Sequence, residues 1–375
     1  MKSNKQKFFA FIFITGMIII GNTQAGAEEI TIRLHCWSGY AKPYVEGFKK
    51  IVKNKHHVDV NMEITNVSDP SEFWKLSRKK KVDIISPAHN IPRSPSWSFV
   101  SGKIILPINL NNIPSYKHIL PVLQKNEFVT EGGKVYGVPY TMGLYGLAYN
   151  TEKVEEPESW NVLWKDTSKG LYTISKSYSD CNIYITSLVL GASYEFLYDI
   201  DKLRTKLDIG KTMLELRKSH LQRKLDTLTD NAYSLWEGTA NPDEFDKLAY
   251  AATWGYAIRK ANNEGFKWKM AKPREGTTMW VDHWAITYAV KNNPLKKKLC
   301  EEWIDYCLSQ DLQIGVIRNW GVSPVVTNIN ELITEDEIDT FNVGDNEYWK
   351  TLSPWSYQNK RTKNSYKILW KSTID

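Results

Sequence analysis

Short apolar stretches recur along the chain and predict strands, with helical patterns between them. Residues 30–34 alternate apolar and polar positions, as a half-buried strand does, and a second such strand is expected over 58–64. Residues 44–52 and 73–80 follow the period of amphipathic helices, and 82–85 form a short continuous apolar run. This β-α-β-α-β order predicts a mostly parallel sheet with helices on both faces.

The same alternation continues through the rest of the chain and predicts a second α/β segment. No internal repeat or low-complexity segment interrupts it. Further strands are expected at 135–140, 143–150, 171–174, 248–254 and 284–290, and further helices at 160–164, 182–191, 209–219, 243–248, 295–308 and 362–370.

Polar and aromatic residues follow the predicted strands of the first segment. Ligands of open α/β sheets bind in the crevice beyond the carboxyl ends of the strands. Trp37, Ser38 and Tyr40 follow the first strand, and His89 and Asn90 follow the third. We therefore expect these five residues to form one wall of a ligand site.

The N-terminus has the composition of a secretory signal peptide. Three lysines within the first seven residues precede an apolar run over 8–20, and Ala25-Gly26-Ala27 follows. An uncleaved membrane anchor is the alternative, but the run is shorter than the ~20 residues that span a bilayer. We predict that residues 1–27 are removed and that the mature protein is soluble in the periplasm.

The remaining chain of roughly 350 residues is too long for one compact core and suits two lobes. The formal charge of +7 falls to about +4 without the three N-terminal lysines, and the basic run over 78–81 is typical of a solvated helix end. Neither feature favours a nucleic-acid partner. We expect a monomer.

The chain lacks the sequence motifs of common catalytic sites. No Gly-x-Ser-x-Gly, His-Glu-x-x-His or phosphate-binding glycine loop is present, and we expect no cofactor or metal. An enzyme would need a perturbed acid–base pair, for which Asp180, Asp282, His89 and His283 are the candidates. The four cysteines of the chain are too few for a disulfide framework. We interpret them as small buried apolar residues.

Aromatic residues are abundant, with 15 Trp and 20 Tyr. Trp37, Trp254, Trp280 and Trp320 end strands or lie in loops. In an extended segment Trp280 and Asp282 share one face, so that a ring and a carboxylate meet there. A ring can stack on an ammonium group and a carboxylate adds a charge-assisted hydrogen bond, which together make an amine site. A core tryptophan beside a capping aspartate is the alternative.

Several of these segments together resemble the periplasmic binding proteins for spermidine and putrescine, which serve ATP-driven importers. Each segment alone is weak evidence for the family, but the segments occur in the family's order. They are Cys36-Trp37-Ser38-Gly39-Tyr40, Asp83-Ile84-Ile85-Ser86-Pro87, Val138-Pro139-Tyr140 with 146–150, Ser159-Trp160 through Lys169-Gly170, and Pro273-Arg274-Glu275-Gly276 with Trp280-Val281-Asp282.

The resemblance implies a two-lobed periplasmic-binding-protein fold of type II, an α/β fold with a mixed, mostly parallel sheet in each lobe and crossover strands between them. The signal peptide would occupy 1–27. Lobe 1 would comprise 28–141 and about 282–326, and lobe 2 would comprise 142–281 and about 327–375.

The resemblance also implies where ligand contacts lie. Trp37 and Tyr40 would line the first lobe, Trp254 the second, and Trp280 and Asp282 the crossover. With the residues named above, the full predicted binding set is Trp37, Ser38, Tyr40, His89, Asn90, Tyr145, Asp180, Trp254, Trp280, Asp282 and Trp320.

The sequence departs from the family where polyamine binders carry further acids. Tyr178 and Cys181 occupy those positions, only Asp180 lies nearby, and His89-Asn90 stands where an aromatic residue is expected. An unpaired buried charge costs several kcal/mol. One or two carboxylates therefore suit a monoamine, a diamine or a quaternary ammonium better than a longer polyamine.

These observations predict an exported protein that closes around a small cationic ligand, delivers it to a membrane ABC importer and catalyses nothing. Two alternatives remain open. The same closure could be detected by a membrane sensor, or the fold could carry a secreted enzyme. The ligand could also be a small solute other than a polyamine.

Overall fold

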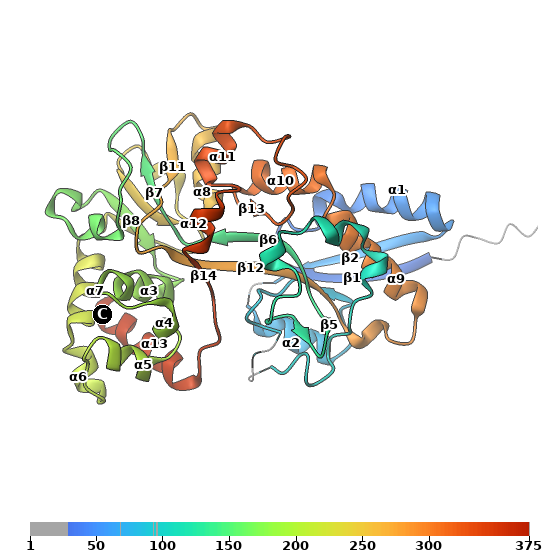
Figure 1. The fold of residues 1–375 in the computed structure, drawn as a ribbon, viewed down its shortest axis with the longest axis horizontal. Helices are drawn as coiled ribbons and strands as arrows, with labels where there is room; N and C mark the ends of the chain where they lie inside the picture. The colour runs from blue at the N-terminus through green and yellow to red at the C-terminus, as the bar shows by residue number, and fades with distance from the viewer. Residues whose placement is uncertain (1–28, 68, 93, 95–96, 375) are drawn as a thin grey trace, which may run out of the picture.

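The computed structural model describes residues 29–374 except 68, 93, 95 and 96. The predicted signal peptide lies outside the described residues and stays a prediction. Among the helices of the described part, none has the length and apolar character needed to cross a membrane. The chain forms two groups of elements, drawn at the left and right of Figure 1, with strands running between them.

The first group is built on a seven-stranded sheet with the order β13-β6-β12-β3-β1-β2, to which β14 is added beside β12. β2 and β3 flank β1 in parallel register, while β12 pairs antiparallel with both β3 and β6. The strands are β1 (Glu29–Cys36), β2 (Asp59–Asn66), β3 (Ile84–Ile85), β6 (Val138–Leu144), β12 (Thr277–Ile286), β13 (Ser323–Pro324) and β14 (Leu352–Pro354).

Helices α1 (Val45–His56), α2 (Ser71–Arg78) and α9 (Pro294–Cys307) belong to this group. α1 buries Phe48 and Val52 and ends where His57 adopts a left-handed conformation. Burial of such apolar side chains is the main stabilising contribution. A small hairpin, β4 (Thr130–Glu131) and β5 (Lys134–Val135), lies beside the sheet.

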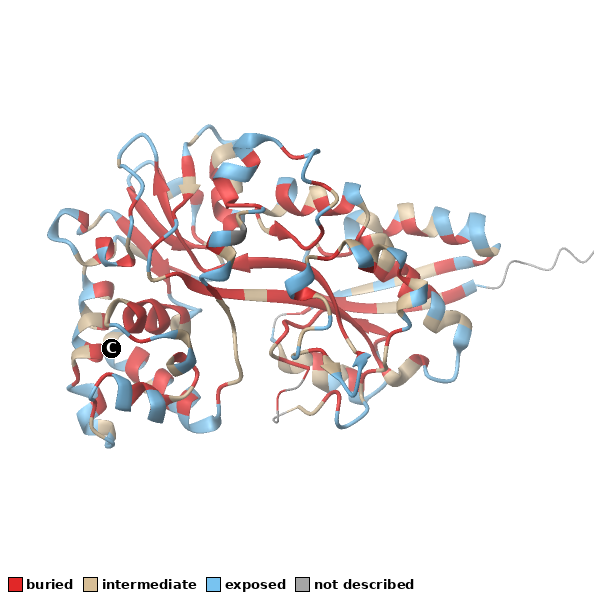
Figure 2. Cartoon of the chain, viewed as in Figure 1, coloured by how far each residue is buried: buried red, intermediate tan, exposed pale blue. Residues whose placement is uncertain are grey.

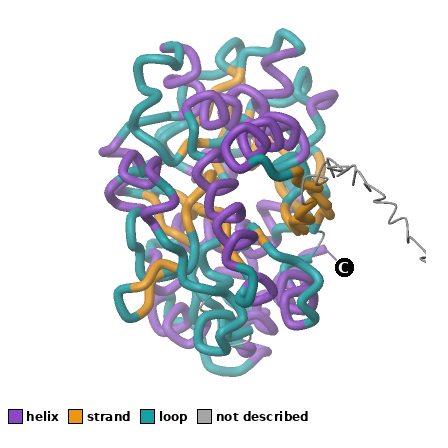
Figure 3. The backbone as a smooth tube through the Cα atoms, turned by 90° about the vertical axis from the view of Figure 1, so that its right-hand side faces the viewer, coloured by secondary structure: helices purple, strands orange, loops and turns teal. Residues whose placement is uncertain are grey.

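The second group is built on a five-stranded sheet with the order β11-β7-β10-β8-β9. Its strands are β7 (Gly146–Asn150), β8 (Tyr172–Ser175), β9 (Ser234–Trp236), β10 (Tyr250–Thr253) and β11 (Trp268–Met270). Its helices are α3 (Ser179–Val189), α4 (Tyr194–Leu197), α5 (Ile200–Lys206), α6 (Met213–Arg217), α7 (His220–Asp230), α8 (Gly255–Asn263) and α13 (Lys360–Ile374). Figure 3 shows the molecule from the right-hand side of Figure 1, with the first group facing the viewer and helices and loops around the strands.

Three segments connect the groups. The chain passes from β6 through Tyr145 into β7, returns from β11 into β12, and passes again from β14 into α13. β6 and β12 pair along their length and are buried almost throughout, as Figure 2 shows. These paired strands form a rigid floor between the two groups.

The segment after α9 contacts both groups. α10 (Gln310–Trp320) packs against α8 as well as β13, and α11 (Glu335–Phe341) packs against β11. α12 (Asn346–Lys350) then leads into β14. The lobe boundaries given above remain a prediction.

Most predicted elements occur where expected. The two sheets are mixed as predicted but not mostly parallel, because half of the strand pairings in each sheet are antiparallel. Local differences include the following three. The helix predicted over 209–219 is only α6, because Ser219 caps the start of α7. The helix predicted over 243–248 is a single 3-10 turn, Pro242–Glu244. The strand predicted over 284–290 ends at Ile286, because the Thr287 hydroxyl accepts from the Ala289 amide and starts a 3-10 turn.

Candidate functional site

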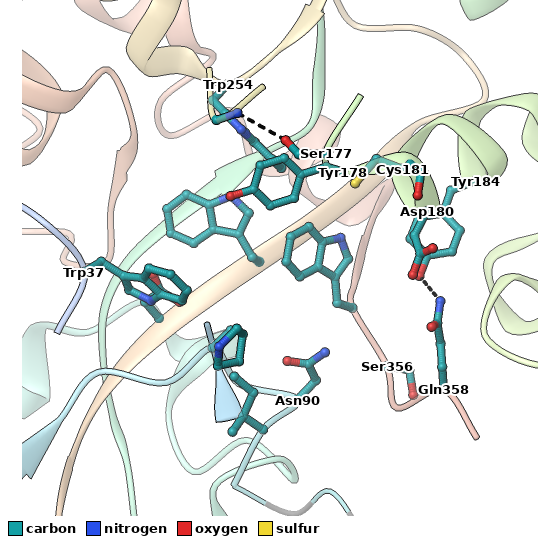
Figure 4. A pocket seen from close by; sticks show the side chains of 18 of the residues that line it. Trp37, Asn90, Ser177, Tyr178, Asp180, Cys181, Tyr184, Trp254, Ser356 and Gln358 are labelled. Atoms are coloured by element: carbon teal, nitrogen blue, oxygen red, sulfur yellow. Dashed lines mark hydrogen bonds between the residues drawn. The ribbon is translucent and has the colours of Figure 1, made fainter. Parts of the chain in front are cut away.

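A cavity of about 810 Å³ lies between the two groups of elements. Its size falls in the range of small-molecule sites. Eight of the predicted ligand residues line it, and Figure 4 shows how several of them surround a common space. They are Trp37, Tyr40, Asn90, Asp180, Trp254, Trp280, Asp282 and Trp320.

Asp282 is the buried carboxylate of the cavity, with only 5% of its surface exposed. It lies on β12 next to a β-bulge between Asp282 and His283, and Tyr40 donates a hydrogen bond of 2.6 Å to its Oδ2. Burial raises the pKa of the Asp282 carboxyl to about 7, and the hydrogen bond from Tyr40 opposes this by lowering it. A carboxyl with this pKa gives up its proton readily when a cation approaches.

Trp280 lies two residues before Asp282 on β12 and faces the same cavity. Its ring lies against Gly143 of β6, where a Cβ atom would come within 2.5 Å of Trp280 Cζ2. Glycine at position 143 therefore leaves room for the indole, which stays beside the carboxylate. The ring and acid predicted to share one face of an extended strand do so.

The turn after β1 supplies one wall. The backbone amide of Trp37 donates to Ser86 Oγ at 3.2 Å, and its ring meets Phe73 edge-on at 5.9 Å. Gly39 has φ +90°, and a Cβ there would lie 1.9 Å from the ring of Trp320. Only glycine adopts this backbone while allowing such close packing. The turn thus brings Trp37, Tyr40 and Trp320 to one side of the cavity.

Trp254 forms the opposite wall at the carboxyl end of β10. Its ring packs edge-on against Tyr178 at 4.9 Å, Tyr145 at 5.3 Å and Trp355 at 6.2 Å. Eleven of the described residues lining the cavity are aromatic, so ring faces form a large part of its wall. Such walls favour flat or cationic ligands.

Asp180 lies in the first turn of α3 and lines a different part of the cavity. Burial raises the pKa of its carboxyl, while a hydrogen bond from Gln358 and the charge of Lys363 both lower it. Figure 4 shows the contact between Asp180 and Gln358.

Comparison with known proteins identifies the family. Residues 79–352 match the family model for bacterial extracellular solute-binding proteins. The chain belongs to this family. The solute-binding family predicted from the motif order is thereby confirmed.

Several curated relatives of this solute-binding protein are named for the polyamines that they bind. It is 22% identical over 154 residues to the putrescine-binding periplasmic protein SpuD of Pseudomonas aeruginosa, a match that covers 39% of this chain and 40% of the relative. It is 25% identical over 217 residues to spermidine/putrescine-binding periplasmic protein 1 of Haemophilus influenzae, covering 52% of each. With the putrescine-binding protein PotF of Escherichia coli it shares 19% over 336 residues, covering 83% of this chain and 82% of the relative.

Solved structures agree on the fold. The spermidine/putrescine substrate-binding protein PotD of Streptococcus pneumoniae superposes with a TM-score of 0.71 at 18% identity, covering 92% of this chain and 98% of that one. A putative spermidine/putrescine transporter protein of Listeria monocytogenes gives 0.68 at 17% identity, with the same coverage. The two-lobed type II fold predicted from the sequence is confirmed.

Three predicted ligand residues of this solute-binding protein do not line the cavity. Ser38 is exposed in the turn after β1. His89 is buried, with its Nε2 donating to the Trp355 carbonyl at 2.6 Å and its Nδ1 accepting from the Val281 amide. Burial lowers the pKa of His89 to about 4, so the ring is neutral. The His89 ring thus bonds the backbone of Trp355, and it is Trp355 that lines the cavity.

Tyr145 is the third residue, and it is fully buried beneath Trp254. Its hydroxyl donates to Asn182 Oδ1 at 2.7 Å and accepts from the Ser175 amide. Tyr145 therefore supports a wall residue from behind.

Sequence reasoning missed several residues that line the cavity. Tyr178 departs from the family pattern, and its ring forms part of the wall. The aromatic run Trp355-Ser356-Tyr357-Gln358 and Lys363 lie in the polar C-terminal third, and only their aromatic density gave any signal. Among the described residues, no group of three His, Cys, Asp or Glu side chains is arranged to hold a metal.

Proposed function

We propose that this protein binds a small amine in the cavity, in the periplasm after removal of residues 1–27, and delivers it to a membrane ABC importer. The protein acts as a monomer and catalyses no reaction. The observation that carries the proposal is the buried Asp282 carboxylate, which lies between aromatic walls on the strand that links the two lobes.

The chemistry of the wall supports a cationic ligand. The ring faces of Trp37, Trp254 and Trp280 can attract a protonated amine. The same amine can form a charge-assisted hydrogen bond with Asp282. An anion would be repelled by this buried carboxylate, and a sugar would leave the carboxylate without a charged partner. The polyamine-binding names of the relatives point to the same ligand class.

The position of the cavity supports a transport role. Walls from the two groups of elements would both contact the ligand, so that the ligand stabilises the closed arrangement of the lobes. A membrane partner that recognises only this arrangement would then accept loaded protein. The predicted contacts in this proposal are the eight cavity residues named above, with Tyr178 and Trp355 added.

Calorimetric titration with a panel of primary and quaternary amines, amino acids, sugars and anions tests the proposal. We expect at least one amine to bind. Asp282→Asn should lower the affinity for that amine tenfold to a hundredfold, because a hydrogen bond to a charged group is worth about 1.5–3 kcal/mol. Asp208→Asn is the matched control, since Asp208 is exposed, lies outside the cavity and has a left-handed backbone that asparagine tolerates. Binding of only sugars or anions, or unchanged amine binding by the Asp282 variant, would refute the proposal.

A further inference from the structure

Charged side chains divide the cavity into two unlike parts. Asp282 lies on β12, and Tyr40 is its only hydrogen-bond partner among the described residues. Asp180 on α3 lies within the electrostatic reach of Lys363 from α13. Glu237, the other acid that lines the cavity, is exposed and forms an ion pair with Lys176 at 2.8 Å. Asp282 is thus the carboxylate of the described cavity wall that no cationic side chain compensates.

Lys363 is held in place by rings. Its ammonium lies 5.8 Å from the ring centroid of Trp97 and 5.7 Å from that of Tyr357, within the range of cation–π attraction. All three residues line the cavity. Trp97 belongs to the loop that follows β3, whereas Lys363 belongs to α13. A resident ammonium therefore occupies the aromatic pair at this part of the cavity and bridges elements from both groups.

The resident cation changes what a ligand meets there. A second ammonium on the ligand would approach Asp180 beside the positive charge of Lys363, and both would compete for the same rings. Gln358, which donates to the Tyr184 hydroxyl at 2.5 Å and also contacts Asp180, adds no charge. The region around Asp180 is close to neutral overall, while the region around Asp282 carries the full negative charge once deprotonated.

We propose that Lys363 sets the charge of the ligand: it neutralises the Asp180 part of the cavity and repels a second ammonium, so that the site prefers a singly charged amine to a diamine of the same length. This inference rests on the proposed function and narrows its substrate class. Lys363 acts as a specificity-determining residue, because its main effect is to exclude the wrong ligand.

Butan-1-amine and butane-1,4-diamine are the probes, since they have the same carbon chain and differ in one ammonium. The wild-type protein is expected to bind the monoamine at least tenfold more tightly. Lys363→Gln should shift this ratio at least tenfold toward the diamine, and Lys363→Glu should shift it further. Lys367→Gln is the matched control, because Lys367 lies one turn further along α13, is exposed and does not line the cavity.

The outcomes separate the inference from the proposed function. If the amines bind but the wild type prefers the diamine, or the ratio is unchanged in both Lys363 variants, the inference is wrong and the proposed function survives. If neither probe nor any other amine binds, the inference and the proposed function are both wrong. Melting temperatures of the variants, expected to equal that of the wild type because Lys363 is exposed, exclude misfolding as the cause.

Discussion

At the scale of single residues, Asp282 links ligand binding to stability. Its carboxyl is buried, and burial raises its pKa from 3.8 to about 7. Between about pH 4 and pH 7 the folded protein therefore holds a proton that the unfolded chain has released. The free energy of unfolding includes a contribution that is complete below about pH 4, falls as the pH rises through this window, and is lost above about pH 7.

This linkage predicts that Asp282→Asn stabilises the protein at pH 8, because the variant no longer buries a charge. The gain is at most about 4 kcal/mol, because burial raises the pKa of the carboxyl from 3.8 to about 7. Urea unfolding at pH 4 and pH 8 measures it, with Asp208→Asn as control. Near-equal stability of wild type and variant at pH 4 is also expected. Parallel pH profiles for the two proteins would contradict the assignment.

The residue scale also shows what the sequence could reveal of the site. Trp280 and Asp282 were predictable as a pair, since residues two apart in a strand share a face. His89 and Tyr145 were placed near the site, but the sequence could not show that their polar atoms bond backbone and side-chain groups behind the wall. Those bonds depend on segments brought together only by the fold.

At the scale of elements, the β6–β12 pair fixes the aromatic floor. A Cβ at Gly143 would press on Trp280 at 2.5 Å, and this contact lies between two buried strands that cannot separate easily. Gly143→Ala is expected to destabilise the protein by about 1–3 kcal/mol and to weaken amine binding, because the indole must leave its position beside Asp282. Thermal unfolding and calorimetric titration measure the two effects.

Gly146→Ala on β7 provides the comparison for that variant. A Cβ there meets Met270 Sδ at 2.8 Å, and the flexible methionine side chain can move aside. A smaller loss of stability and unchanged amine affinity are expected. Equal loss of affinity in both variants would show that Gly143 acts through general strain and not through Trp280.

Elements differed in how well the sequence predicted them. Strand β1 and the long helix α9 were clear, because their apolar periodicity matched their burial, whereas the short strands β13 and β14 of the same sheet were not predicted. The segment from Trp355 to Gln358 was not predicted to line the site, because its role depends on contacts across hundreds of residues, such as that between His89 and Trp355, 266 positions apart. Local patterns carry no information about such contacts.

At the scale of the whole molecule, the cavity lies where three connecting segments join two sheets, and residues from two of these connections line it. Asp282 lies on β12 and Trp355 follows β14, while Tyr145, between β6 and β7, packs against the wall residue Trp254. A ligand in this position contacts both groups and the strands between them, so that binding at a single buried carboxylate can favour closure of the whole protein.

Proton release on amine binding tests the central claim most directly. Calorimetry at pH 6 in buffers of different ionisation enthalpy counts the protons released. Because the pKa of Asp282 is about 7, binding of a cation should release close to one proton at pH 6 and almost none at pH 8.5. Amine binding at pH 6 without proton release would show that the positive charge does not sit on Asp282.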